Sequence, residues 1–343
     1  MRQIRRCGPG LTSAAIVLAL LTSPLLQSTA RAATDVVAAA RRLAAYKHGV
    51  LTYGSSQPSW PGPSWYPSSV TKPVPGHSDY ATVVNAPDLP PAALAALLAS
   101  KNLQVRILAA LLVEKHGDEE LGRMLLHKIE HLDLGADEAV LYYVYALGRA
   151  GTIATIMRLV EWQMMNRDRW TALCQKRQDR GFHGTYRERG LKVCVLRAVG
   201  VIMHRHRRQL RTETAPRGDV ATFTEVIVRL ARALASGMKT GDERYEVLSA
   251  LMLIDHRLAD EYLERYWSAT SWTEPATPRE RLDANWLLIA ASVLATPKAI
   301  ELLREVAADD GRPYSGVAKR RLKQAETHGP KLDPGVEEQE SPD

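Results

Sequence analysis

The chain has 343 residues, of which 45% are hydrophobic, and it carries three cysteines and a formal net charge of +7 at pH 7. It contains no phosphate-binding loop, dinucleotide-binding fingerprint or calcium loop, which excludes the ligand classes that these motifs define. No stretch stands out as strand-like, whereas apolar residues recur with helical spacing nearly everywhere after Pro90. The pattern therefore predicts an all-α protein.

Residues 1–32 have the three parts of a secretory signal peptide: a start with three arginines, an uncharged apolar run over 11–26, and an A-x-A cleavage site at 30–32. The apolar run is short and interrupted for a membrane span, which needs about 20 apolar residues. An uncleaved N-terminal anchor is the alternative interpretation. We predict an exported protein, periplasmic or secreted, whose mature chain begins at Ala33 and is not membrane-spanning.

Cleavage changes the charge of the chain. Residues 1–32 carry four arginines and no acid, so the formal charge falls from +7 to +3 when they are removed. The tail over 326–343 holds six acids and one lysine without apolar periodicity, and we expect it to be disordered. The remaining positive charge is concentrated in one region of the chain.

The N-terminal part of the mature chain is predicted to hold one helix, over 33–49, followed by a loop segment over 50–91. This segment contains nine of the nineteen prolines, interleaved with aromatic residues. Long irregular segments inside compact domains are usually functional or disordered. One interpretation is a meander that packs its aromatic residues onto the first repeats. The other is a binding loop in which Trp60, Trp65 and Tyr66 stack on a sugar or peptide.

The segment from His127 to His131 matches H-x-x-E-H, the inverted zinc-protease pattern. On a helix, His127 and His131 lie one turn apart and can bind one metal ion, with Glu130 as a general base. The helical wheel places the apolar residues on the opposite side, so both histidines should face water. No companion motif supplies a third protein ligand, so the pattern indicates weak surface metal binding or a plain polar face.

Residues 166–190 are predicted to be a basic insertion. Fifteen lysines and arginines against five acids occur between Arg158 and Arg217, and such a field attracts anionic partners. The alternative is a solvated face whose arginines pair with acids of other helices. The candidate binding residues for an anionic partner are the following five arginines: Arg169, Arg177, Arg180, Arg187 and Arg189.

Cleavage leaves two cysteines, Cys174 and Cys194. In an oxidising compartment such a pair is a disulfide candidate, and closing a loop of this length would add roughly 3 kcal/mol to stability. Two buried thiols are the alternative, because Cys194 lies within an apolar helical run. Two cysteines are too few for a zinc site, which needs three or four ligands.

Apolar helical stripes separated by Gly, Pro or Asp continue over 92–325. The helices over 193–203 and 286–294 are apolar on most faces, so neighbours should cover them on several sides. The pairs of helices recur at about 30 to 40 residues, the range of helical repeats.

Two stretches resemble HEAT repeats. In 94–112 the second helix opens with Val105-Arg106, and in 300–322 it opens with Val317-Ala318 and carries Arg320. The resemblance implies a right-handed stack of antiparallel helix pairs, an armadillo-like α-solenoid. It implies a fold and no particular activity.

We therefore expect a non-enzymatic binding scaffold without a cofactor that recognises a protein or an anionic envelope component. Export makes nucleic acid an improbable partner. The alternatives are a zinc-dependent hydrolase that uses His127, Glu130 and His131, and a structural assembly subunit. The sequence does not indicate the oligomeric state.

Overall fold

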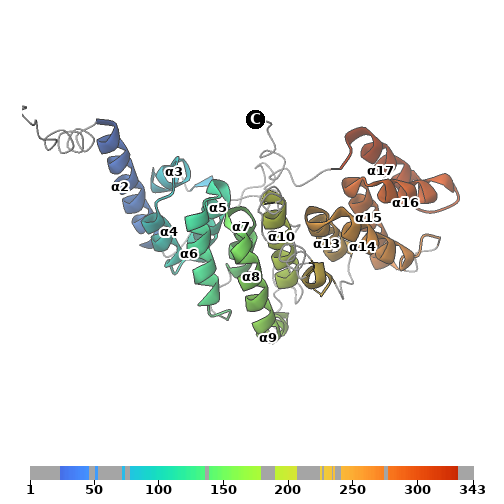
Figure 1. Cartoon of the computed structure of the whole chain (residues 1–343), viewed down its shortest axis with the longest axis horizontal. Helices are drawn as coiled ribbons and strands as arrows, with labels where there is room; N and C mark the ends of the chain where they lie inside the picture. The colour runs from blue at the N-terminus through green and yellow to red at the C-terminus, as the bar shows by residue number, and fades with distance from the viewer. Residues whose placement is uncertain are drawn as a thin grey trace, which may run out of the picture.

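The protein is all-helical in the computed structural model, apart from one short pair of strands (Figure 1). The structure describes residues 24–45, 51–52, 72–73, 78–135, 139–178, 190–206, 225, 228–233, 235, 241–273 and 277–330.

The labelled helices and strands, in chain order, are α2 (Pro24–Ala45), β1 (Leu51–Thr52), β2 (Lys72–Pro73), α3 (Ser78–Val84), α4 (Pro91–Leu98), α5 (Leu103–His116), α6 (Glu119–Glu130), α7 (Val140–Ala150), α8 (Ile153–Met165), α9 (Arg167–Gln178), α10 (Gly190–Arg205), α13 (Gly241–Ile254), α14 (His256–Ser268), α15 (Pro278–Leu294), α16 (Pro297–Ala308) and α17 (Ser315–His328). β1 and β2 pair antiparallel.

Capping residues set the helix boundaries. The Asn102 side chain accepts a hydrogen bond from the backbone of Gln104 and starts α5, as N-cap residues do. Gly117 ends that helix in the left-handed conformation at φ 63°, which glycine adopts without steric cost. Asp118 then caps α6 by accepting from the backbone amides of its first turn. Only Gly117 and Asp118 thus separate the two helices.

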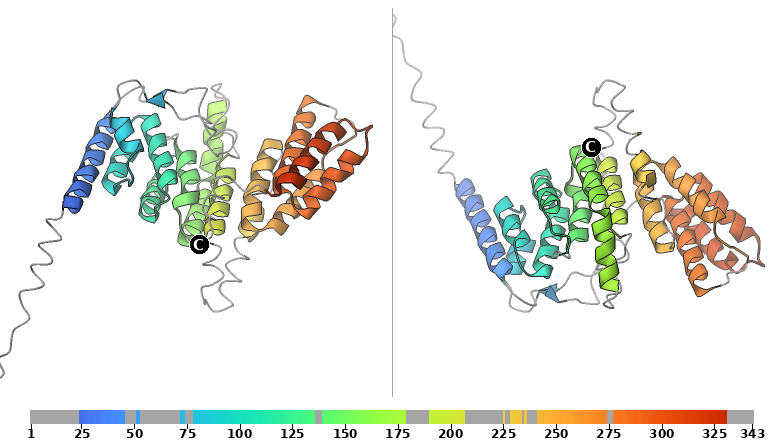
Figure 2. Two further views of the ribbon diagram at one scale, coloured as in Figure 1. Left: turned by 90° about the horizontal axis from the view of Figure 1, so that it is seen from above. Right: turned by 90° about the horizontal axis from the view of Figure 1, so that it is seen from below.

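The helices follow one another in chain order along the long axis of the molecule (Figures 1 and 2). They can be divided into two sets. In the first set, α5, α7, α10, α13, α15 and α17 each pack on the next. The second set holds α4, α6, α8, α14 and α16. Each of these contacts the first-set helix that precedes or follows it in the chain, and α8 does so with α10, beyond α9. The core therefore runs along the molecule between the two sets.

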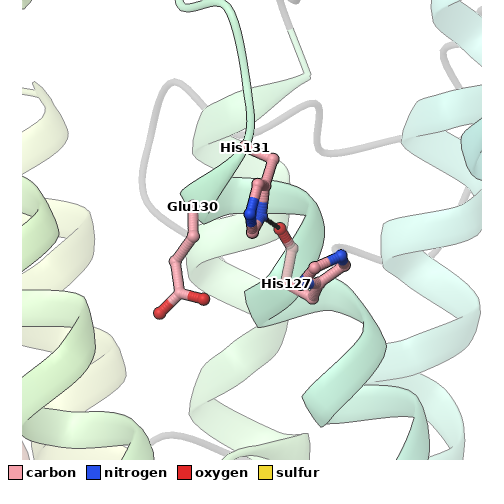
Figure 3. Close-up of side chains that lie close together, drawn as sticks. All are labelled: His127, Glu130 and His131. Atoms are coloured by element: carbon pink, nitrogen blue, oxygen red, sulfur yellow. Dashed lines mark hydrogen bonds between the residues drawn. The ribbon is translucent and has the colours of Figure 1, made fainter.

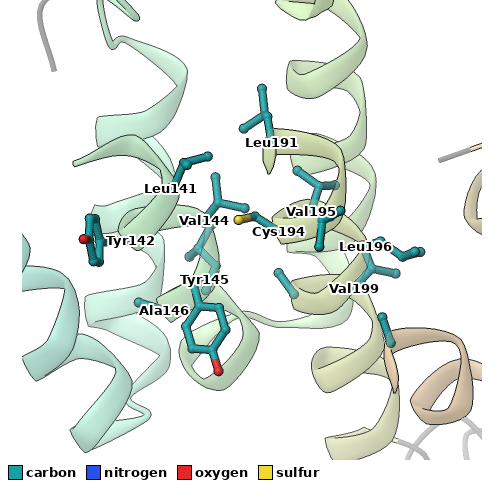
Figure 4. Packing of buried hydrophobic residues seen from close by; sticks show 14 of the residues in the cluster. Leu141, Tyr142, Val144, Tyr145, Ala146, Leu191, Cys194, Val195, Leu196 and Val199 are labelled. Atoms are coloured by element: carbon teal, nitrogen blue, oxygen red, sulfur yellow. The ribbon is translucent and has the colours of Figure 1, made fainter. Parts of the chain in front are cut away.

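Burial is more complete in α7 and α10 of the first set than in α6 of the second. All the residues of α7 except Arg149 are buried, and so is every residue from Val193 to Met203 in α10. Figure 4 shows the side chains of these two helices in contact. In α6, by contrast, burial is confined to one face. The prediction that the helices over 193–203 and 286–294 are covered on several sides is confirmed.

Among the described helices, α10 and α13 make the substantial contact that joins α2–α10 to α13–α17. Gly200 allows this close approach, because a Cβ atom at its position would lie 2.7 Å from the carbonyl oxygen of Ala250. Val201 and Leu253 pack together at the same junction.

Two segments differ from their sequence interpretation. The predicted loop over 50–91 includes the helix α3 and the strand pair β1–β2. The ion pair between Arg42 and Asp79, at 2.7 Å, links α3 to α2, and Val83 is buried. The predicted insertion over 166–190 begins with α9, which is anchored by the buried Trp170.

Helix α2 continues through the predicted signal cleavage site at 30–32. The side chains from Ala32 to Asp35 are exposed, and the buried residues of the described part begin at Val36. A chain that begins at Ala33 would keep all of these buried residues. Among the described residues, no helix combines the length and apolarity that a membrane crossing requires.

Candidate functional site

The C-terminal end of α6 brings together His127, Glu130 and His131, the three residues of the H-x-x-E-H pattern (Figure 3). The rings of His127 and His131 lie 4.2 Å apart between centroids, at an angle of 47°. Both side chains are exposed, which confirms that they face water. Among the described residues, this is the group of histidine, cysteine and acidic side chains whose spacing suits a metal ion.

A hydrogen bond fixes the orientation of the His131 ring. Its Nδ1 atom lies 2.9 Å from the backbone carbonyl oxygen of His127, and this contact is the dashed line in Figure 3. A carbonyl oxygen can only accept, so Nδ1 carries the proton and donates it. In the neutral ring the lone pair is then on Nε2. The outer nitrogen of His131 is therefore the one that is able to bind a metal ion.

Glu130 is held by Arg158 of α8 in a two-point ion pair. The Nε atom of Arg158 donates to Oε1 at 2.8 Å, and an Nη atom donates to Oε2 at 2.5 Å. Both carboxylate oxygens are thus engaged by one guanidinium, the strong geometry for this pair of groups. The carboxylate that the sequence pattern offers as a general base is therefore occupied by a cation from another helix.

Of the five arginines predicted to bind an anionic partner, Arg169 is the one whose side chain the structure describes. It is exposed on α9, and its guanidinium lies 2.6 Å from the carboxylate of Asp133 in the α6–α7 loop. Both side chains are more than half exposed, and such pairs contribute about 0–1 kcal/mol to stability. The pairing agrees with the sequence alternative in which arginines of this region meet acids from other helices.

The junction of α8 and α9 exposes two apolar side chains that the sequence interpretation did not single out. Met164 is 61% exposed and Met165 is 78% exposed, and the exposed Arg167 and Arg169 follow on α9. The sequence does contain a sign of this exposure. Both methionines follow Val160, near the end of the apolar stripe of α8. Flexible methionines are common on surfaces that adapt to a partner.

Several predicted site residues lie outside the described part of the chain. Arg177 belongs to α9, but its side chain is not among those described. The other predicted site residues outside the described part are Arg180, Arg187, Arg189, Trp60, Trp65 and Tyr66.

Cys174 and Cys194 are both buried thiols, and no disulfide joins them in the structure. Cys194 projects from α10 toward Val144 of α7, among apolar side chains (Figure 4). Burial raises the pKa of the Cys194 thiol well above its ordinary value, Glu246 adds to this effect and Arg197 opposes it. The alternative of two buried thiols therefore describes the structure better than the predicted bridge.

A buried ion pair lies where α10 meets α13. Arg197 and Glu246 are 3.5 Å apart, with side chains that are 9% and 6% exposed. The Arg197 guanidinium also lies 5.3 Å from the centre of the Tyr145 ring in α7, within the range of a cation–π interaction. One arginine thus connects α7, α10 and α13, three successive helices of the first set.

No protein-family model, curated protein sequence or solved structure shows a significant match to this chain. The fold and the geometry above define an all-helical protein.

Proposed function

We propose that the chain is an exported, HEAT-like α-solenoid that acts as a non-enzymatic binding scaffold. The continuous packing of α5, α7, α10, α13, α15 and α17, each on the next, supports a repeat-like stack. Val105 and Ala318 of the two HEAT-like stretches are buried and Val317 is half-buried, which supports the HEAT-like form. Stacks of this kind present extended surfaces to partners.

The binding surface of this scaffold is centred on the α8–α9 junction and takes an anionic partner, either a protein or an envelope polymer. The observation that carries this assignment is the exposure of Met164 and Met165 beside the cationic Arg167 and beside Arg169, which is paired with Asp133. Apolar contacts next to positive charge suit a partner that offers both features. The predicted arginines of the segment 179–189 follow α9 in the sequence and add to the positive charge of this region of the chain.

Export rests on the predicted signal peptide, and the position of the cleavage site supports it. The buried residues of α2 that the structure describes, from Val36 to Leu43, all follow that site. Removing residues 1–32 therefore leaves this part of the core intact. The hydrolase alternative has less support, because the Glu130 carboxylate is engaged by Arg158.

The test is binding of the purified mature chain to envelope polymers of known charge. We expect binding to an anionic polymer that weakens with salt, and little binding to a neutral one. Reversing Arg167 and Arg169 to Glu should weaken binding, and so should replacing Met164 and Met165 by Ser. Arg232→Glu is the matched control, because Arg232 also forms an exposed ion pair, at 2.7 Å from Glu261.

Binding that is equal for all these variants would exclude the α8–α9 junction as the binding surface. The segment of Arg180, Arg187 and Arg189 is tested separately by reversing those three charges together.

A further inference from the structure

We propose that His127, Glu130 and His131 bind one divalent transition-metal ion at the end of α6, and that Arg158 competes with this ion for the Glu130 carboxylate. The three side chains each offer one ligand atom, and these atoms lie within 4.8 Å of one another. Two imidazoles and a carboxylate form a ligand set that suits Zn²⁺ and Cu²⁺ better than Mg²⁺ or Ca²⁺. The site is independent of the scaffold function proposed above.

The His131 ring is already oriented as a ligand. Histidines that bind metals in proteins almost always donate their second ring nitrogen to a carbonyl or carboxylate oxygen. The Nδ1 atom of His131 makes this contact with the His127 carbonyl oxygen at 2.9 Å. The bond fixes the tautomer and leaves Nε2 as the donor atom toward the solvent side of the helix.

Small side-chain rotations would complete the coordination geometry. Two nitrogens bound to one tetrahedral zinc ion, each at about 2.0–2.1 Å, lie about 3.3 Å apart. Both histidines are exposed, and the buried residues Leu125 and Ile129 lie on the other side of α6. The two rings can therefore approach each other without disturbing the core.

Arg158 makes this site different from a simple pair of histidines. It engages both oxygens of Glu130, so the carboxylate must leave the guanidinium before it binds a metal ion. The Arg158 side chain is 52% exposed and that of Glu130 is 22% exposed, so water can solvate the guanidinium when the pair opens, but a bidentate pair is stronger than most surface ion pairs. The exchange of partners therefore lowers the affinity for the ion, and it links metal binding at α6 to the contact between α6 and α8.

The experiment is calorimetric titration of Zn²⁺ into the full chain, purified without a histidine tag. We expect one ion per chain. The double variant His127→Ala/His131→Ala should lose this binding, and Glu130→Gln should weaken it by about tenfold. Arg158→Gln should strengthen it several-fold, because the Glu130 carboxylate is then available without competition. His328→Ala, which removes an exposed histidine of α17, should bind like the wild type.

The results that overturn the proposal are equally specific. Stoichiometric binding that survives the double histidine substitution would place the ion elsewhere, and absence of saturable binding to the wild type would remove the site. Binding that is unchanged in Glu130→Gln and Arg158→Gln would overturn the competition. Circular dichroism of each variant shows whether the helices are retained, which the exposure of these side chains leads us to expect.

Discussion

Gly200 of α10 lies directly against the backbone of Ala250 in α13, since a Cβ atom added at position 200 would come within 2.7 Å of the Ala250 carbonyl oxygen. The obstacle is backbone rather than a flexible side chain, so it cannot rotate away. Leu253 lies close to the same point, at 3.3 Å. A methyl group at this position must therefore separate the two helices.

We expect Gly200→Ala to lower the free energy of unfolding by about 1–3 kcal/mol, the cost of overpacking a filled interior. Urea denaturation followed by circular dichroism measures this change. Gly316→Ala is the control, because Gly316 lies in α17 with no heavy atom within 4 Å of the added Cβ. There the higher helix propensity of Ala should make the change neutral or stabilising by up to about 1 kcal/mol. Equal effects at both positions would contradict the close approach.

The buried pair of Arg197 and Glu246 leads to a second prediction. Arg197→Met should destabilise the protein by about 3–5 kcal/mol, because it leaves the Glu246 carboxylate buried beside an apolar side chain. The double variant Arg197→Met/Glu246→Leu should recover much of this loss, since it removes both charges. A double-mutant cycle from urea denaturation measures the coupling. Additive effects of the two substitutions would show that the charges do not interact.

Cys194 should be unreactive in the folded protein. Its raised pKa and full burial leave almost no thiolate at pH 8, and the thiolate is the reactive form. In a Cys7→Ser/Cys174→Ser variant, we expect an alkylating reagent to label Cys194 slowly under native conditions and rapidly in denaturant. Mass spectrometry gives the labelled fraction. Rapid native labelling would contradict the packing of Cys194 between α7 and α10.

A separate measurement addresses the bridge. The mature chain, denatured without a reducing agent, should show two titratable thiols if Cys174 and Cys194 are both reduced. A chain isolated from an oxidising compartment with no titratable thiol would instead support the disulfide that the sequence predicts.

The lowered pKa of His116 leads us to predict that the protein loses stability in acid. Burial lowers its pKa, Lys115 lowers it further, and Asp88 and Asp118 act in the opposite direction. The Nε2 atom is buried without a hydrogen-bond partner in the structure. The folded state then binds fewer protons than the unfolded state below about pH 6.5, the ordinary pKa of histidine. Linkage therefore requires stability to fall as the pH decreases through the lowered pKa.

We expect the difference in urea midpoint between pH 7 and pH 5 to be smaller in His116→Gln than in the wild type. The comparison isolates His116, because the other titrating groups are common to both proteins. An identical pH dependence in the two proteins would show that His116 does not contribute.

Apolar periodicity was sufficient to predict the helices with continuous stripes. The sequence predicts a helix over 153–165, and α8 occupies these residues. The boundaries are predictable because Gly151 precedes the helix and its apolar stripe ends near Met165. Helix α9 was not predicted, since Trp170 and Cys174 are its buried anchors and span one turn. A single turn of apolar residues is too short a pattern to distinguish from a loop.

Part of the candidate metal site was predictable because it depends on local helical spacing. The spacing of His127 and His131 and the apolar face of their helix are local properties, so the sequence predicts their outward direction. The pairing of Glu130 with Arg158 joins residues 28 positions apart, and it depends on how α6 packs against α8. No periodicity within one helix carries that information.

The contact of α10 with α13 also has a mechanical consequence. Among the described helices, α10 and α13 make the extensive contact between the N-terminal helices and those after α13, so the angle at this contact governs how the two parts are oriented. A wedge of one methyl group at Gly200 would turn the part that ends at α17, and a small angle at the contact becomes a large displacement at its tip. The rigidity of this junction therefore sets how constant the distance between the two ends of the molecule is, and with it the size of the partner that could touch both.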